Sequence, residues 1–574
     1  MAAGLSSGMF GTRMRRRRLM GTALAGGGAA FVIACGGSQS RSESTGGATG
    51  SSQGGGIATA VTGQTAPGST EQVKRGGTFT ISNGSPRTLD PHFDTFPANT
   101  IVTNNVYNKI LTFTPDLTKI EPELATAMPE QPDPLTYTFK IRQGIKYQNV
   151  PPANGREMTA ADVKYSIERQ MTREPGKFQH AYFFLDRIAS IETPDNYTVT
   201  MKMAKPYAPF MSYVASPWTM VINKELVERD GDLTQNAVGT GPFIFEEWQK
   251  DVQHRLRRNP DYWEKDASGG ALPYVDNIVV RISTDANAIQ AMFVNQDVLA
   301  SGIQFTFVEE IKKKFPKANY RAVPSQFWRQ MRTSPYDGMK YQHRAPFTDI
   351  RVRQAIVQSV NKQEILDTVF SGDGIPAFGP ILPIYPLWAL KEDPVKFDIA
   401  SSKQLLEAAG HGQGWDDEMI FAQGAAGDTA SQVGEVLKSQ LAKIGVNVTL
   451  KPMDSTAYYN KTYAYDYTMS HHVPLNNPDP DENLASYFGR NSTFFKWGNQ
   501  DVWALIDKQA ETLDQAERQK IVEEAQRKIV LDYPMSFIYS PNGHYFTHSK
   551  VKGWFYPNDL YDGRLKEVWI DPAG

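Results

Sequence analysis

Cysteine is nearly absent from this chain. Its 574 residues contain one, Cys35, so no disulfide can form within the chain and pairing says nothing about the redox compartment. Charge of one sign is not in excess either, because 60 Lys and Arg residues are balanced by 62 Asp and Glu, a formal net charge of −2. Without a basic field, nucleic acid is not expected as a partner.

Several catalytic motifs are missing as well. The sequence has no GxSxG and no thiol besides Cys35. The run from Gly239 to Gly241 continues into Phe243 without the third glycine of a dinucleotide loop, and there is no Walker motif or HExxH pair. We therefore expect no catalytic residue, no cofactor and no metal. A secreted hydrolase with two carboxylates is kept as a formal alternative.

The length of the chain predicts more than one hydrophobic core, so two or three domains are expected. A composition of 40% hydrophobic and 21% charged residues is that of a globular protein. Aromatic residues make up 11%, with 25 Tyr and 10 Trp. They fit a large core, a ligand groove lined by flat rings, or both.

The first residues have the layout of an export signal. Arg15 to Arg18 precede a short apolar run, Leu19 to Ala34, which is too short to span a membrane. Val32 to Cys35 resembles a bacterial lipobox, and Arg16-Arg17 resembles a twin-arginine signal. We expect a signal peptide over 1–34 and a lipid anchor at Cys35, with an incidental thiol as the alternative. Residues 35–75, rich in Gly and Ser, are expected to form a flexible tether that reaches roughly 35 Å.

The segment from Val238 to Trp263 predicts a β-hairpin. Gly239, Gly241 and Pro242 are expected to make a turn in which glycine tolerates positive φ. Alternation then predicts a strand from Phe243 to Glu247, a returning strand from Gln253 to Arg257, and a turn at Asn259-Pro260.

Periodicity predicts further elements before and after this hairpin. Strands are expected at Thr78–Ser82, around Tyr137, Phe139 and Ile141, at Tyr197–Met203 and at Tyr274–Ile282, and helices after a capping box at Thr159–Asp162 and over Ala286–Val294.

The later part of the chain predicts an α/β arrangement. A helical stripe from Val352 to Val360 is followed by a helix capped by Asn361. Arg351 and Arg353 lie on the other face of the stripe and are expected to be solvated or paired at the surface. A helix from Val433 to Ile444 stops at Gly445 before the alternating residues Val446, Val448 and Leu450. A late helix, Ala516 to Tyr533, leads into a strand that begins with Phe537 and Tyr539.

Two ordered motifs carry a family resemblance. GTGPF at Gly239–Phe243, the strand pair and RNPDYW at Arg258–Trp263 resemble the hallmark segment of the oligopeptide/dipeptide-type extracellular solute-binding proteins of ABC importers, family 5. PF-D-RVRQA, which begins at Pro346, resembles the same family, as do the sequences around Tyr137 and Asp162. The resemblance covers nearly everything from Gly76 to Tyr539.

The resemblance implies an α/β, periplasmic binding protein-like fold of class II type, with two lobes joined by a hinge and an inserted subdomain. It implies lobe I over 76–120, 238–325 and 541–574, the inserted subdomain over 121–237, and lobe II over 326–540. The implied function is capture of oligopeptides or dipeptides in a cleft between the lobes and delivery to a membrane permease. Permease and ATPase would be separate chains, and this chain a monomer held outside the cytoplasm by its lipid anchor. A sensor subunit with the same binding fold is a further alternative.

The densest polar cluster runs from His471 to Asp481. Asp479, Asp481 and Asn483 have the opening rhythm of a calcium loop, but Leu484 and Arg490 stand where such a loop needs Gly and Glu. The cluster fits either a Pro-rich turn after a strand at Tyr465–Met469 or a ligand loop. As a ligand loop it offers these candidate site residues: His471, His472, Asn476, Asn477 and Asp479.

Asn476 departs from the family pattern. The resemblance implies that peptide binders carry an aspartate here, which anchors the α-ammonium group of the peptide. An amide accepts a hydrogen bond but lacks the charge that makes such a bond roughly twice as strong. Two solute classes therefore stay open: peptides held mainly through main-chain bonds, and an uncharged solute such as an oligosaccharide.

Trp328, Gln330 and Arg332 occupy alternate positions where the chain is expected to enter the second lobe. A strand there would place all three on one face, with Trp328 stacking on a solute and Arg332 meeting a carboxylate or hydroxyl. The alternative is a buried tryptophan and a surface arginine.

Overall fold

The computed structural model describes residues 72–93, 97–171, 187–333, 345–422, 429–474, 477–492, 495, 497–554 and 565–573. The predicted signal peptide, Cys35, nearly all of the tether and Asn476 lie outside these residues. Within the described ranges, no helix has both the length and the apolar character needed to cross a membrane.

Twelve strands of the described chain form one mixed sheet, in the order β16-β15-β17-β13-β18-β11-β1-β10-β9-β8, with β12 and β14 also paired to β18. We call the strands on one side of β18 the first group: β1 (Thr78–Asn83), β8 (Phe243–Gln249), β9 (Gln253–Arg258), β10 (Asn277–Ile282), β11 (Ala300–Ile303) and β12 (Asn319–Pro324). The second group is β13 (Arg329–Thr333), β14 (Gly374–Pro376), β15 (Trp415–Ala422), β16 (Val446–Met453) and β17 (Met469–His472).

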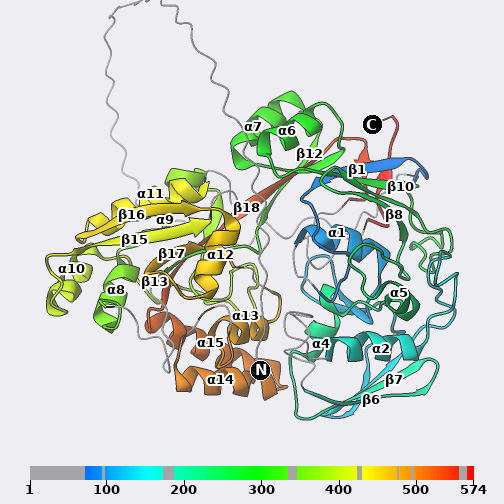
Figure 1. Cartoon of the computed structure of the whole chain (residues 1–574), viewed down its shortest axis with the longest axis horizontal. Helices are drawn as coiled ribbons and strands as arrows, with labels where there is room; N and C mark the ends of the chain where they lie inside the picture. Colours follow the sequence, from blue (N-terminus) through cyan, green and yellow to red (C-terminus); the bar gives the residue numbers. More distant parts are fainter. Residues whose placement is uncertain are drawn as a thin grey trace, which may run out of the picture. The chain divides into compact units, whose positions relative to one another are not determined.

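Strand β18 (Met535–Thr547) belongs to both groups (Figure 1). Its first half pairs with β13 and β14, and its second half pairs with β11 and β12. The change falls between Pro541, opposite Gly374, and Asn542, opposite Pro324. The predicted strand at Phe537 and Tyr539 is confirmed, and it does lead back to the first strands of the chain. The predicted domain boundaries, including the one at 540/541, remain a prediction.

The predicted hairpin is confirmed as β8 and β9, which pair antiparallel from Phe243 opposite Arg258 to Gln249 opposite Gln253. The expected reason for its glycines is wrong, because neither Gly239 nor Gly241 has a positive φ. They are required by close approach instead. A Cβ on Gly239 would lie 2.2 Å from the carbonyl oxygen of Val106, and one on Gly241 would lie 2.6 Å from the carbonyl carbon of the same residue.

The second group is the α/β unit that the sequence predicts. Helix α11 (Thr429–Ala442) leads through Gly445, with φ of 84°, into β16, which pairs parallel with β15. Asn361 caps α9 (Lys362–Phe370) by accepting from the backbone N–H of Glu364, as expected. The helices α8 (Ile350–Gln358), α9 and α11 and the strands share one hydrophobic core.

Two expectations for this region are wrong. Arg353 is not solvated: its side chain is buried and donates to the carbonyl oxygens of Phe347 and Asp532 at 3.1 Å each. The strand expected over Tyr465–Met469 runs instead from Met469 to His472. This change in the bounds of the strand matters for the candidate site, because both histidines lie in the sheet and not in a loop.

Residues 121–237 contain a separate antiparallel sheet, in the order β4-β5-β7-β6 within the described residues. Its strands are β4 (Glu130–Asp133), β5 (Thr136–Lys140), β6 (Ile188–Asp195) and β7 (Thr198–Met203). Tyr137 and Phe139 are buried, and the helix predicted after Thr159 is α2 (Ala160–Met171).

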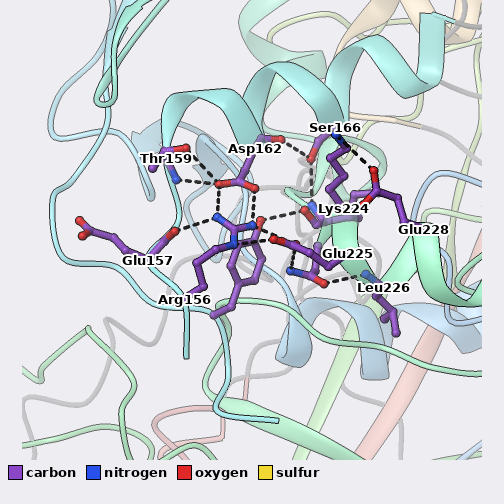
Figure 2. A network of polar contacts seen from close by, with 12 residues as sticks. Arg156, Glu157, Thr159, Asp162, Ser166, Lys224, Glu225, Leu226 and Glu228 are labelled. Carbon is purple, nitrogen blue, oxygen red and sulfur yellow. Dashed lines mark hydrogen bonds and ion pairs between the residues drawn. The ribbon is translucent and has the colours of Figure 1, made fainter. Parts of the chain in front are cut away.

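A polar network ties α2 to α5 (Lys224–Asp230), as Figure 2 shows. Arg156 donates to Asp162 of α2 at 2.7 Å and to Glu225 of α5 at 3.0 Å. Asp162 in turn accepts from the backbone N–H of Thr159 at 2.8 Å, which is the capping interaction that the sequence predicts.

The remaining elements cover the sheets or connect them. The helices are α1 (Pro97–Val106), α4 (Phe210–Val214), η2 (Pro217–Thr219), α6 (Ala286–Val294), η3 (Phe305–Phe307), α7 (Val308–Lys314), α10 (Ile399–Ala408), α12 (Ser455–Tyr463), α13 (Pro480–Phe488), α14 (Gln500–Glu511) and α15 (Gln515–Leu531). The short strands are β2 (Leu111–Phe113), β3 (Ile120–Pro122), β19 (Val551–Lys552) and β20 (Trp569–Ile570).

The close approach at Gly239 gives a first prediction. Gly239→Ala should lower the free energy of unfolding by roughly 1–3 kcal/mol or more, since the added Cβ collides with backbone atoms that have no room to move. Gly84→Ala is the matched control, because its Cβ would meet the Cβ of Ala98 at an ordinary 3.5 Å. Urea unfolding of both variants measures the effect, and equal stability would contradict the explanation.

Candidate functional site

The ends of three strands of the second group meet at one edge of the sheet. β15 and β17 are parallel, and β13 runs antiparallel to β17, with Gln330 opposite His472. The carboxyl ends of β15 and β17 therefore lie beside the start of β13. We call this place the carboxyl edge. In open α/β sheets, ligands bind in the crevice outside the carboxyl ends of the strands.

The carboxyl edge contains most of the residues singled out in the sequence. His471 and His472 end β17, and Gln330 and Arg332 lie on β13 beside them. The Gln330 amide, oriented with its oxygen toward Arg332, accepts from Nε and Nη2 at 2.6 and 2.7 Å. The guanidinium of Arg332 also lies over the ring of Phe495, 5.4 Å from its centre. Gln330 and Arg332 thus share a face, as predicted, but both are buried.

Trp328 directly precedes β13 and is buried against β18, the strand that pairs with β13 on the side away from β17. Its ring stacks on Phe537 of β18 with centres 5.2 Å apart and planes at 15°, and 2% of the residue is exposed. Its indole Nε1 has no hydrogen-bond partner. This placement gives Trp328 a packing role, and contact with a solute remains a prediction.

Tyrosines of α12 cover the carboxyl edge. The hydroxyl of Tyr458 lies 3.0 Å from the carbonyl oxygen of His471, to which it donates, and 2.8 Å from Nδ1 of His472. The ring of Tyr459 meets His472 edge-on at 6.0 Å and stacks on Tyr463, which is half exposed. Such rings offer a solute large rigid faces with polar tips.

Positive charge gathers at the same edge. Burial raises the pKa of Tyr459, and the charges of Arg332, Arg329 and Arg87 oppose this rise. Arg87 comes from the segment that follows β1 in the first group. Charges from both strand groups therefore act on the Tyr459 hydroxyl.

Both histidines are neutral near neutral pH. Burial, with a smaller effect from the Arg329 charge, lowers the pKa of His471 to about 3. Burial also holds the pKa of His472 well below its ordinary value, and the charges of Arg332, His471 and Arg329 act in the same direction. A neutral imidazole has one N–H donor and one acceptor nitrogen. Nε2 of His471 is buried without a partner.

Asp479 and Asn477 lie on the segment that leaves β17. Asp479 caps α13 and forms a buried ion pair with Arg518 of α15, with Nη2 to Oδ1 at 2.6 Å and Nη1 to Oδ2 at 3.0 Å. The backbone N–H of Asn477 donates to the Asn483 side chain, which donates back to the Asn477 carbonyl oxygen. These contacts position the segment, and direct contact of Asp479 or Asn477 with a solute remains a prediction.

The same segment contacts residues 121–237. The hydroxyl of Tyr207 donates to Asp481 at 2.7 Å. Further along the chain, the carbonyl oxygen of Ala510 in α14 accepts from the backbone N–H of Ala208 at 2.8 Å. Ser212 donates to Asp479 at 3.2 Å. The three acidic and amide side chains that resembled the opening of a calcium loop are thus occupied by protein partners.

The sequence reasoning missed Arg329, Arg87 and the tyrosines of α12. Arg329 was missed because strand alternation placed Trp328, Gln330 and Arg332 on the face assigned to the solute, and Arg329 on the opposite face. The dense run of tyrosines from Tyr458 to Tyr467 was a visible signal for aromatic lining. Nothing local in the sequence pointed to Arg87, since its proximity to α12 is a property of the fold.

Comparison with known proteins identifies the family. The model of "Bacterial extracellular solute-binding proteins, family 5 Middle" matches residues 119–495, more than half of the chain. The chain belongs to this family of extracellular solute-binding proteins, and its fold is that of the periplasmic binding proteins.

Individual relatives are similar over most of their length. Di/tripeptide-binding protein 1 of Pseudomonas aeruginosa is 29% identical over 497 residues, which cover 80% of this chain and 89% of the relative. A periplasmic binding protein, DppA of Helicobacter pylori, solved with the peptide STSA, superposes with a TM-score of 0.75 at 24% identity and covers 87% of this chain and 98% of its own. AgaA of A.tumefacien R10, solved with agropinic acid, superposes with a TM-score of 0.73 at 24% identity and covers 86% and 99%.

The ion pair of Asp479 gives a second prediction. Arg518→Gln should lower the free energy of unfolding by about 3–5 kcal/mol, because it leaves a buried carboxylate without its charge partner. Lys202→Gln, which breaks an exposed pair with Glu192, should cost less than about 1 kcal/mol. Denaturant unfolding distinguishes the two, and a small loss for Arg518→Gln would show that the pair is dispensable.

The buried imidazoles give a third prediction. His471 has a lower pKa folded than unfolded, so its contribution to stability is fully present above pH 6.5 and is lost as pH falls toward about 3. His471→Gln should therefore flatten the loss of unfolding free energy below pH 6.5 by up to about 1.4 kcal/mol per pH unit. Unfolding curves from pH 8 to pH 4 measure this slope. Above pH 7 the two proteins should differ by a constant offset, and parallel curves throughout would contradict the assignment.

Proposed function

We propose that this chain captures small peptides at the carboxyl edge and delivers them to the membrane permease of an ABC importer. The observation that carries the proposal is membership of the solute-binding family. Relatives named for di/tripeptide binding in Pseudomonas aeruginosa and for dipeptide binding in Escherichia coli support a peptide as the solute. Permease and ATPase are separate chains in this proposal.

The proposed mechanism is closure about the hinge. Strand groups on both sides of β18 contribute to the site, with Arg87 from one side and β13, β17 and α12 from the other. A solute that contacts both sides gains those contacts in the closed state alone. This difference in affinity shifts the population toward the closed state, which is the form that a permease can distinguish from the empty one.

The binding residues of the proposal follow the geometry. The tyrosine rings of α12 stack on the solute, and the His471, His472, Gln330 and Arg332 side chains provide or position polar groups. Asn476 lies outside the described residues and is proposed to accept a hydrogen bond. Trp328, Asn477 and Asp479 are proposed to contact the solute as well, in addition to the packing and positioning contacts that they make within the protein.

The proposal places the protein outside the cytoplasm. Residues 1–34 would be removed as an export signal, and Cys35 would carry the lipid that holds the chain at the membrane. The glycine- and serine-rich residues 35–75 would then tether the binding domain, as a monomer, within reach of the permease.

Peptide binding is tested by thermal unfolding of the purified protein with a mixture of di- and tripeptides, and separately with neutral oligosaccharides. Saturation at a hundred times the dissociation constant should stabilise the protein by about 2.7 kcal/mol, because the ligand binds the folded state alone. Stabilisation by the sugars and not by the peptides would replace the peptide with an uncharged solute.

Tyr459→Ala, with Tyr165→Ala on α2 as a matched control, tests the place of binding. The first variant should weaken peptide binding by roughly three- to tenfold, as loss of one aromatic contact does, and the second should leave it unchanged. Equal affinity of both variants for the peptide would move the site away from α12.

A further inference from the structure

The end of helix α7 carries lysines without carboxylate partners. Lys313 and Lys314 close this helix, and Lys317 follows it in the turn before β12. All three residues are exposed, and none forms an ion pair with any residue in the described part of the chain. Lys312, one position earlier, does pair with Glu309, with Nζ to Oε1 at 2.9 Å. The end of α7 therefore presents positive charge that the described fold leaves unmatched.

A fourth lysine belongs to the same surface. The ring of Phe315, which follows α7, meets the ring of His548 edge-on, with centres 5.1 Å apart. Two residues after His548 comes Lys550, whose Nζ donates to the neutral amide oxygen of Gln296 at 3.5 Å. Asp297 on that turn is acidic, and the four lysines still leave an excess of positive charge. We call Lys313, Lys314, Lys317 and Lys550 the basic end.

The basic end lies beside the place where the chain enters the fold. Lys74, at the start of the described residues, forms an ion pair with Asp571. The backbone N–H of Asp571 donates to the carbonyl oxygen of Lys550 at 2.7 Å. The segment that arrives from Cys35 therefore joins the fold next to one of the four lysines.

The protein as a whole has the opposite charge. A chain that begins at Cys35 has lost five arginines, so its formal net charge falls from −2 to −7. An anionic surface therefore repels most of the molecule and attracts the basic end. Phe315, the large apolar residue among the lysines, packs against Phe293 within the protein. The basic end thus offers charge to a partner and not an apolar wedge.

We propose that the basic end is a contact surface for the anionic headgroups of the membrane to which the chain is anchored. The inference rests on the lipid anchor of the proposed function and goes beyond it, because it assigns the end of the domain that faces the bilayer. Each lysine near an anionic bilayer strengthens binding by roughly fivefold, and basic patches commonly act together with a lipid as a second signal.

The consequence of this contact is a preferred orientation. A flexible tether holds the domain near the bilayer but does not select which side faces it. Four lysines close to the point of attachment select that side, since they alone among the two features distinguish one face of the domain from another. The domain then meets a permease in the same bilayer in a limited set of orientations.

The test uses the full-length chain with its lipid, inserted into vesicles of phosphatidylcholine alone or of phosphatidylcholine mixed with phosphatidylglycerol. A water-soluble acetylating reagent is added, and mass spectrometry measures the rate at which each lysine reacts. Lys550 reports on the basic end. The exposed residues Lys438 and Lys451, on α11 and β16, report on a distant part of the chain.

We expect Lys550 to react roughly three- to tenfold more slowly on the mixed vesicles than on the neutral ones, because anionic headgroups cover its amine and hold its proton. Lys438 and Lys451 should react equally fast on both kinds of vesicle. Salt at about 1 M, which shortens the screening length to about 3 Å, should remove the difference at Lys550.

A triple variant tests which residues make the contact. Lys313→Gln combined with Lys314→Gln and Lys317→Gln should abolish the slower reaction of Lys550 on the mixed vesicles. Peptide binding by this variant should equal that of wild type, because none of the three residues lies at the carboxyl edge.

The matched control removes the same charge elsewhere. It combines Lys403→Gln, Lys508→Gln and Lys520→Gln, which replace exposed lysines of α10, α14 and α15 that have no ion pair in the described chain. Lys550 should stay protected in this control.

The outcomes separate the contact from the anchor. Equal reaction of Lys550 on both kinds of vesicle would overturn the contact and leave the anchor standing, and protection that survives the triple variant or disappears equally in the control would overturn the assignment to α7. Protection that needs an added permease and not an anionic lipid would give this surface to a protein partner instead. A chain that washes off both kinds of vesicle would overturn the anchor and, with it, the contact.

Discussion

The backbone hydrogen bonds of β18 join the two strand groups of the main sheet. One strand of 13 residues pairs with β13 and β14 at its start and with β11 and β12 at its end. Both strand groups are therefore joined through one strand, whose pairing with β13 has a register irregularity between Arg329 and Gln330. Because a shift by one residue would turn every side chain of β18 to the other face, the register of this strand fixes the faces of both groups at once. That register also sets which faces the histidines and arginines of the carboxyl edge occupy, because β13 pairs with β18 and β17 pairs with β13.

Electrostatics at the carboxyl edge differ from those of the rest of the described core. Two buried arginines away from the edge are paired, Arg518 with Asp479 and Arg169 with Asp90. At the edge, Arg329 and Arg332 lie among tyrosines, and two histidines are held neutral by burial. Titratable groups with strongly perturbed pKa values cluster at functional sites, which supports a binding role for this edge. Buried polar atoms without a hydrogen-bond partner, Nη1 of Arg329 and Nε2 of His471, therefore mark this site more clearly than any sequence motif does.

Many elements could be predicted from the sequence because their signals are local. The alternation from Phe243 to Glu247, the Asn361 cap and the helix–Gly445–strand unit depend on residues within a few positions of one another. The predictions that were wrong concern residues whose contacts lie far away in the sequence. Arg353 was expected in solvent, and its burial is compensated by carbonyl oxygens of Phe347 and Asp532, one of them 179 positions away. The strand β17 was misplaced because His471 and His472 are polar, and periodicity cannot show that they line a buried edge.

The sequence by itself determined the family, the α/β class, the hairpin and the order of the elements, since ordered motifs and hydrophobic periods are written along the chain. Tertiary structure alone decided why Gly239 and Gly241 must be glycine, because the backbone of Val106 that they touch is more than a hundred residues away. It alone also set which distant charges, those of Arg87 and Arg329, act on the pKa of Tyr459. Contacts between distant segments also decide which side chains are buried. Burial in turn sets the state of charge of His471 and leaves the Arg329 cation without an ionic partner in the described chain, and no local sequence pattern shows either result.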